Sequence, residues 1–137
     1  MSAQPGQSKY GFSRTVEIPF DAAIEKIRAA IRDEGFGVLS EIDIKEKLKE
    51  KLDVDFRRYT ILGACNPSLA YKTLQEELEI GLLLPCNVIV YEADDASKSV
   101  VSAVDAKAML SVVGNNATLD QVASEVNERL ERVISSL

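Results

Sequence analysis

The sequence has 137 residues, of which 46% are hydrophobic and 28% charged, and its formal net charge is -6. This length and balance indicate one globular domain, and the acidic charge argues against a nucleic-acid partner, because phosphates are bound by clustered Lys and Arg. Histidine is absent, which excludes Ser-His-Asp and Cys-His catalysis and removes the usual ligand of zinc and iron.

Residues 1–8 are polar and include Pro5 and Gly6, so we expect a flexible N-terminal tail before a single α+β domain over residues 9–137. This start has no apolar core of a signal peptide, and nowhere do about 18 apolar residues follow one another. We therefore expect a cytoplasmic protein with no membrane partner, in which cysteines are reduced.

The first half of the chain predicts two strands and two helices. Alternating apolar side chains over residues 10–18 predict a strand with one buried face. Asp21 is expected to cap a helix whose apolar residues recur at helical spacing, and Gly35 suits a left-handed stop at its end. Residues 36–42 are predicted as a second strand, and residues 44–52 as a short charged helix.

A third strand is predicted over residues 57–65, followed directly by a helix. Asn66 can cap the free amides of that helix, and Pro67 is preorganised for its first position. Apolar residues carry the helix as far as Leu78, and Gly81 follows its end.

Residues 86–92 and 100–104 are predicted as strands joined by a hairpin. Thr118 and Gln121 have the spacing of a capping box before a long C-terminal helix with an apolar stripe. The order is therefore strand, helix, four further strands with short helices inserted between them, and helix. It indicates an α+β fold, with an antiparallel sheet of about five strands covered by two main helices.

The chain has two cysteines, Cys65 and Cys86, and an asparagine follows each one. If the third and fourth strands are antiparallel neighbours, the two sulfurs lie near the same edge of the sheet. Cys65 also precedes the N-terminus of the helix that Asn66 caps, where free amides favour a thiolate and lower the thiol pKa if the sulfur points toward them. Three interpretations stay open: inert packing of both thiols, a reactive Cys65 with Cys86 as its partner, or Cu(I) held by two thiolates.

These motifs lead to two hypotheses of different classes. The first is a site for a small ligand or thiol species, rimmed by Cys65, Asn66, Cys86 and Asn87. Asn87 is unusual in a strand, and either bonds the loop that carries Cys65 or presents its amide to a ligand. The alternative is a structural or protein-interaction homodimer with inert cysteines. No catalytic residue, cofactor or metal is predicted, and thiol-redox enzymes are disfavoured because a Cys-x-x-Cys motif is absent.

Three segments together resemble family 302 of the domains of unknown function, and the resemblance extends from about Tyr10 to the end. They are IRDEGFGVLSEIDIKEKLKEKL, ILGACNPSLA and IGLLLPCNVIVYE. The resemblance implies a compact α+β sandwich akin to the repeat unit of TATA-binding protein, and association as a homodimer. It supplies no reaction. One departure is visible: the family pattern has Asp-Pro after the fifth strand, whereas Asp105 is followed here by Ala106.

Overall fold

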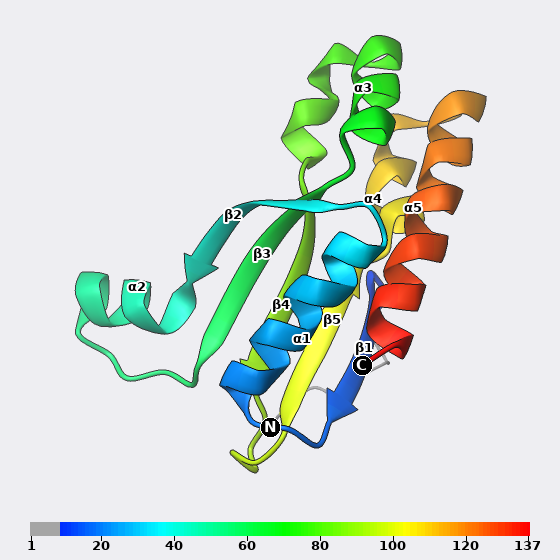
Figure 1. The fold of residues 1–137 in the computed structure, drawn as a ribbon. Coiled ribbons are helices and arrows are strands. Elements are labelled where there is room, and N and C mark those ends of the chain that lie inside the picture. The colour runs from blue at the N-terminus through cyan, green and yellow to red at the C-terminus, as the bar shows by residue number, and fades with distance from the viewer. Residues whose placement is uncertain (1–8) are drawn as a thin grey trace.

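The computed structural model describes residues 9–137, so the tail predicted for residues 1–8 lies outside the described part of the chain. Five strands form one antiparallel sheet in the order β1-β5-β4-β3-β2 (Figure 1). The strands are β1 (Gly11–Val16), β2 (Gly37–Asp43), β3 (Tyr59–Cys65), β4 (Cys86–Glu92) and β5 (Ser99–Val104). The predicted α+β class with about five antiparallel strands is confirmed.

Two long helices, α1 (Phe20–Asp33) and α5 (Ala117–Ser135), lie side by side over one face of the sheet (Figure 1). Shorter helices gather at the end of the sheet where β3 ends and β4 begins, and α3 and α4 both pack against α5 there. These are α3 (Pro67–Glu76), the 3-10 helix η1 (Leu78–Leu83), α4 (Ala106–Leu110) and the 3-10 helix η2 (Ser111–Val113).

The core lies between the sheet and the two long helices. Alternate residues of the central strands point into it, among them Leu62, Val88, Val90 and Val101, all with no exposed surface. The buried faces of α1 and α5 pack against these strand side chains. Each fully buried side chain of this kind contributes about 1.5–3 kcal/mol to folding, so the core, rather than any single polar contact, holds the site in place.

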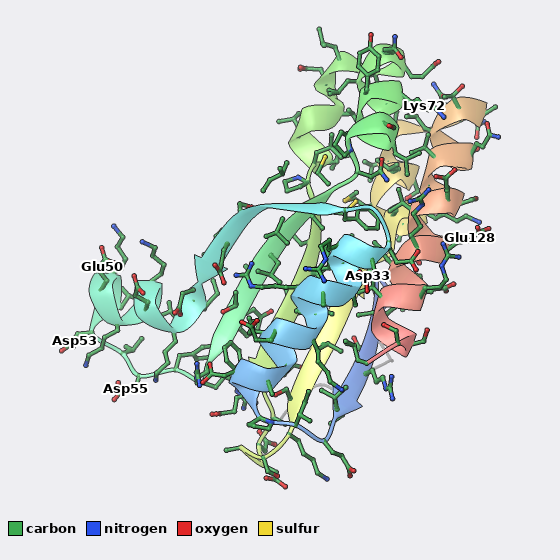
Figure 2. The ribbon with its side chains drawn as sticks, viewed as in Figure 1. Asp33, Glu50, Asp53, Asp55, Lys72 and Glu128 are labelled. Carbon is green, nitrogen blue, oxygen red and sulfur yellow. The ribbon has the colours of Figure 1, made fainter. Side chains whose placement is uncertain are left out.

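Helix α2 (Ile44–Leu52) projects from the body beside β2 and contains no buried residue (Figure 1). The Asp43 carboxylate caps it by accepting a hydrogen bond from the Glu46 amide at 2.9 Å. Asp53 closes its C-terminus in the left-handed conformation, with φ of 54°. Figure 2 shows Glu50, Asp53 and Asp55 around the outer end of α2. Because no residue of α2 is buried, local capping stabilises this helix more than packing does.

Several helix boundaries differ from the sequence prediction. α1 begins at Phe20 after Pro19, without a side-chain cap, and Asp21 instead forms an ion pair with Arg58. The chain therefore reaches helical geometry two residues earlier than it would with Asp21 as the cap. Gly35 has φ of 84°, which confirms the predicted left-handed stop.

The two later helices also deviate. Gly81 does not follow the end of α3 but lies within η1, because α3 ends at Glu76, Glu77 is extended, and a separate 3-10 helix follows. The predicted capping box of Thr118 and Gln121 is wrong: α5 begins at Ala117, and the Asn116 side chain accepts from the Leu119 amide at 3.0 Å.

Candidate functional site

The two cysteines lie at the same end of neighbouring strands. Ala64 is opposite Cys86 in the β3–β4 ladder, so Cys65 ends one strand beside the first residue of the next. This arrangement confirms the expected antiparallel neighbours. Both thiols are free; Cys86 is buried and Cys65 is half-buried.

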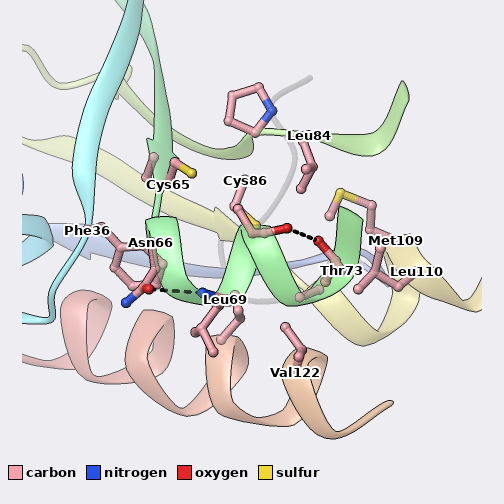
Figure 3. Close-up of a pocket in the computed structure, with 15 residues that line it drawn as sticks. Phe36, Cys65, Asn66, Leu69, Thr73, Leu84, Cys86, Met109, Leu110 and Val122 are labelled. Atoms are coloured by element: carbon pink, nitrogen blue, oxygen red, sulfur yellow. Dashed lines mark hydrogen bonds between the residues drawn. The ribbon is translucent and has the colours of Figure 1, made fainter. Parts of the chain in front are cut away.

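Both cysteines line one apolar cavity between the sheet end and helices α3, α4 and α5 (Figure 3). Its volume is about 30 Å³, which is room for only one or two water molecules. The cavity admits an ion or a very small molecule, but a metabolite enters only if the wall moves. The lining residues are Phe36, Ala64, Cys65, Asn66, Leu69, Ala70, Thr73, Leu84, Pro85, Cys86, Ala106, Met109, Leu110, Val122 and Val126.

The polar side chains that line the cavity, Asn66 and Thr73, already form hydrogen bonds with the backbone. Asn66 Oδ1 accepts a hydrogen bond from the Leu69 amide at 3.2 Å, which confirms the predicted cap of α3 (Figure 3). Its Nδ2 donates to the Gly35 carbonyl at 3.3 Å. The Thr73 hydroxyl donates to the Ala70 carbonyl at 2.7 Å. The sulfur atoms are therefore the groups of this wall that are left to bind a ligand.

The apolar wall also keeps the thiols protonated. Burial raises the pKa of Cys65, and burial together with the nearby Cys65 raises the pKa of Cys86 to about 11. The expectation that the helix N-terminus lowers the pKa of Cys65 is thus wrong. The physical reason is that Asn66 already occupies the Leu69 amide, while the surrounding apolar side chains disfavour a charge.

Asn87 does not belong to this cavity. It follows Cys86 in β4, and successive strand residues point to opposite faces of the sheet, so it is exposed on the face away from α1 and α5. There it borders a separate, more open cavity of about 230 Å³, together with Tyr10, Ile89 and Ser102. Cys65, Asn66 and Cys86 thus line one cavity, whereas Asn87 lies apart. The side chains of Cys65 and Cys86 leave the sheet on opposite faces, because Cys86 pairs with Ala64 and Cys65 is the next residue.

Met109 is a wall residue that sequence reasoning missed. It is half-buried on α4, a helix that the sequence patterns do not predict. Asp105 was the sequence feature that could have predicted α4, because its side chain caps this helix by accepting a hydrogen bond from the Ala108 amide at 3.1 Å. With Met109, three sulfur-containing residues line the cavity.

The fold and the paired Cys-Asn segments correspond to a known family. The family model described as "Domain of unknown function DUF302" matches residues 12–137. This chain belongs to the DUF302 family. A crystal structure of an uncharacterized conserved DUF302 protein from Bacillus stearothermophilus is similar, with 28% sequence identity and a TM-score of 0.83, covering 93% of this chain and 98% of that chain. Among curated proteins, no sequence matches this chain.

In this DUF302 domain, Ala106 stands where the resemblance predicts proline, and the backbone amide of Ala106 is used in a hydrogen bond. The buried amide of Ala106 donates a hydrogen bond to Asn127 Oδ1 at 2.7 Å, and proline has no amide hydrogen to donate. Ala106 thus connects the start of α4 to α5 in a way that proline does not allow.

Two further observations bear on the kind of site. Within residues 9–137, none of the helices combines the length and the apolar character needed to cross a membrane. The same residues contain no cluster of three or more His, Cys, Asp or Glu side chains placed to hold a metal ion.

Proposed function

We propose that this DUF302 protein binds a small, thiol-seeking species at the cavity beside Cys65 and Cys86. One observation carries the proposal: two free thiols from different strands line the same cavity, and its amide and hydroxyl side chains already have partners. The proposal assigns Asn66 a positioning role at the rim and leaves Asn87 out of this site. It takes the cysteines as reduced, as they are in the cytoplasm, and it names no reaction.

The size of the cavity supports a very small occupant. About 30 Å³ excludes a nucleotide, a sugar or a thiol of glutathione size unless α3 or α4 shifts. The high thiol pKa values argue against a rapid nucleophile, since the thiolate is the reactive form. Binding of an ion or a small electrophile is therefore better supported than general thiol-disulfide catalysis.

Thiol labelling with reagents of two sizes tests this proposal on the native chain. Methyl methanethiosulfonate is small, whereas 5,5'-dithiobis(2-nitrobenzoic acid) is bulky. We expect the small reagent to modify Cys65 in the folded protein and the bulky one to react slowly, with Cys65→Ser and Cys86→Ser identifying each thiol by mass spectrometry. If neither thiol reacts with the small reagent before unfolding, both cysteines are core residues and the proposal fails.

A second candidate function is self-association through the sheet face that α1 and α5 leave uncovered. Apolar side chains occupy this face, including Ile61, Ile89 and Ile42, the last of which is 42% exposed. The rings of Tyr59 and Tyr91 stack beside them, 5.2 Å between centroids. A second copy is the occupant that we propose, because Ile42, Ile61 and Ile89 are cross-strand partners that form a continuous apolar stripe. A stable interface needs about 800 Å² on each partner.

Light scattering after size exclusion tests the homodimer. The expected mass is twice that of the chain, and Ile61→Lys should yield a monomer with an unchanged circular dichroism spectrum. Leu78→Lys is the matched control, since Leu78 is 81% exposed on η1, away from this face. A wild-type monomer at all concentrations would contradict this candidate. The likeness to the repeat unit of TATA-binding protein stays a prediction as well.

A further inference from the structure

The three most exposed large apolar side chains of residues 9–137 lie on the two 3-10 helices, η1 and η2. Leu82 is 83% exposed and Leu78 is 81% exposed on η1, and Val112 is 75% exposed on η2. Contact of apolar surface with water is unfavourable, and apolar patches with a polar rim are typical of sites where a partner binds. The surface of η1 and η2 is therefore a candidate interaction site.

A groove of about 330 Å³ runs over η1 and η2. Residues three apart share one side of a 3-10 helix, so Ile80 and Leu83 both face the core, whereas Glu79 and Leu82 both face solvent. Ile80 is 1% exposed, and Leu83 packs against the core, so the floor of the groove is already in place before a partner arrives. The lining residues are Glu77, Glu79, Ile80, Leu82, Leu83, Val112 and Val113.

The rim of the groove is acidic. Glu77 and Glu79 line it, and its lining residues include no Lys or Arg. The Glu77 carboxylate accepts a hydrogen bond from the Glu79 amide at 3.1 Å, which fixes its position. Within residues 9–137, neither carboxylate forms an ion pair. An occupant that carries Lys or Arg beside its apolar side chains is therefore complementary to this groove.

We propose that the η1–η2 groove binds an amphipathic helix of another protein, with apolar side chains in the groove and Lys or Arg side chains beside Glu77 and Glu79. Both walls are helices, which present side chains and no free strand edge, and binding of a helix in a groove uses side chains alone. An anionic lipid surface is disfavoured, because the same carboxylates repel it. This inference goes beyond the proposed function, since the groove and the cysteine cavity share no lining residue.

Fluorescence anisotropy with a defined peptide tests the proposal on the full chain. The probe is a labelled helical peptide of about 18 residues with Leu on one face and Lys on the other. We expect saturable binding of one peptide per chain, and at least about tenfold weaker binding when Glu replaces Lys or when the same residues are scrambled. Equal binding of the Lys and Glu peptides would overturn the proposal.

Leu82→Ser and Glu79→Lys test the groove itself. Both side chains are exposed, so we expect each variant to keep the thermal stability of the wild type and to bind the peptide at least about tenfold more weakly. Leu52→Ser is the apolar control, because Leu52 is 66% exposed on α2, which projects away from the short helices (Figure 1). Glu128→Lys, at an exposed position of α5, makes the same change in net charge. Both controls should bind like the wild type, and equal losses in Glu79→Lys and Glu128→Lys would overturn the proposal.

Two further measurements address other occupants of the groove. Vesicles of phosphatidylcholine and phosphatidylglycerol should not sediment the chain, and sedimentation that Leu82→Ser abolishes would overturn the proposal in favour of a membrane. Leu82→Ser should self-associate like the wild type in analytical ultracentrifugation, and a loss of association would overturn it in favour of a second copy. Cys65→Ser and Cys86→Ser should bind the peptide like the wild type, so failure of the thiol-labelling test leaves this inference intact.

Discussion

The side chain of Asn127 on α5 donates a hydrogen bond from Nδ2 to the carboxylate of Asp105 at 2.9 Å. The oxygen of the same amide accepts the bond from the Ala106 amide. Asn127 is buried among the apolar residues of α5, and both of its partners lie at the start of α4. This pair of bonds therefore fixes the helix that carries Met109 against the long helix of the core.

Replacement of Asn127 should destabilise the fold. In Asn127→Leu the buried amide of Ala106 loses its acceptor, and an unsatisfied buried group of this kind costs about 1–3 kcal/mol. Urea denaturation should show that loss in the free energy of unfolding. Ser124→Ala on the exposed side of the same helix should change it by less than about 0.5 kcal/mol, and equal values for the two variants would contradict the assigned role.

The substitution Ala106→Pro tests the hydrogen bond between Ala106 and Asn127 by removing its donor. Asp105 has φ of -80° and ψ of 105°, an extended conformation that a following proline accepts, and proline suits the first position of a helix. We therefore expect Ala106→Pro to destabilise the wild type mainly by removing the bond to Asn127. In an Asn127→Leu background the same substitution should cost less than in the wild type. Additive effects in this double-mutant cycle, read by denaturation, would refute the coupling.

Asp105 should make stability depend on acid pH. Burial acts to raise its pKa, but hydrogen bonds from Asn127 and from the amides of Ala108 and Lys107 outweigh burial, so its pKa lies below the ordinary value of 3.8. The stabilisation is therefore fully present above pH 3.8 and is lost as the pH falls through the lower folded-state pKa. Denaturation from pH 5 to about 2 should show a shallower decline for Asp105→Asn than for the wild type. Parallel declines would contradict this.

Cys86 should make stability depend on alkaline pH. Its pKa is about 11 in the folded protein, against an ordinary value of 9.0, because burial disfavours the thiolate. The unfolded chain releases the proton first, so the stabilisation is fully present below pH 9 and is lost as the pH rises toward 11. The loss should reach about 2–3 kcal/mol. Cys86→Ala should lack this component in denaturation experiments at about pH 8 to 11, and an identical pH profile would disprove it.

Gly63, which lies in β3 two residues before Cys65, should not accept a side chain without a loss of stability. A Cβ atom there would lie 2.2 Å from Ser40 Oγ and 2.8 Å from Pro85 Cγ, so Gly63→Ala forces the β2–β3 bulge or the start of β4 to shift. We expect a loss of about 1–3 kcal/mol in thermal denaturation. Gly81→Ala is the matched control, because nothing lies within 4 Å of the position that its Cβ atom would occupy, and it should unfold like the wild type.

Local patterns in the sequence were enough to predict much of the fold. Strand alternation, the cap at Asn66 with Pro67, and the left-handed stop at Gly35 depend on neighbouring residues alone, and the structure confirms all three. The short helix α4 was not predicted, because its five residues carry too little periodicity. The capping-box prediction at Thr118 failed because an equally good cap, Asn116, lies two residues earlier.

The sequence by itself determined that Cys65 ends one strand and Cys86 begins the next strand along the chain, since strand alternation and helix capping are local properties of the chain. Only the tertiary structure decided which side chains share a cavity with them. It placed Asn87 on the other face of the sheet and brought Met109 from a distant helix to the wall. It also reversed the expected pKa shift of Cys65, because burial depends on the packing of segments far apart in the sequence, and packing outweighed the local effect of a helix N-terminus.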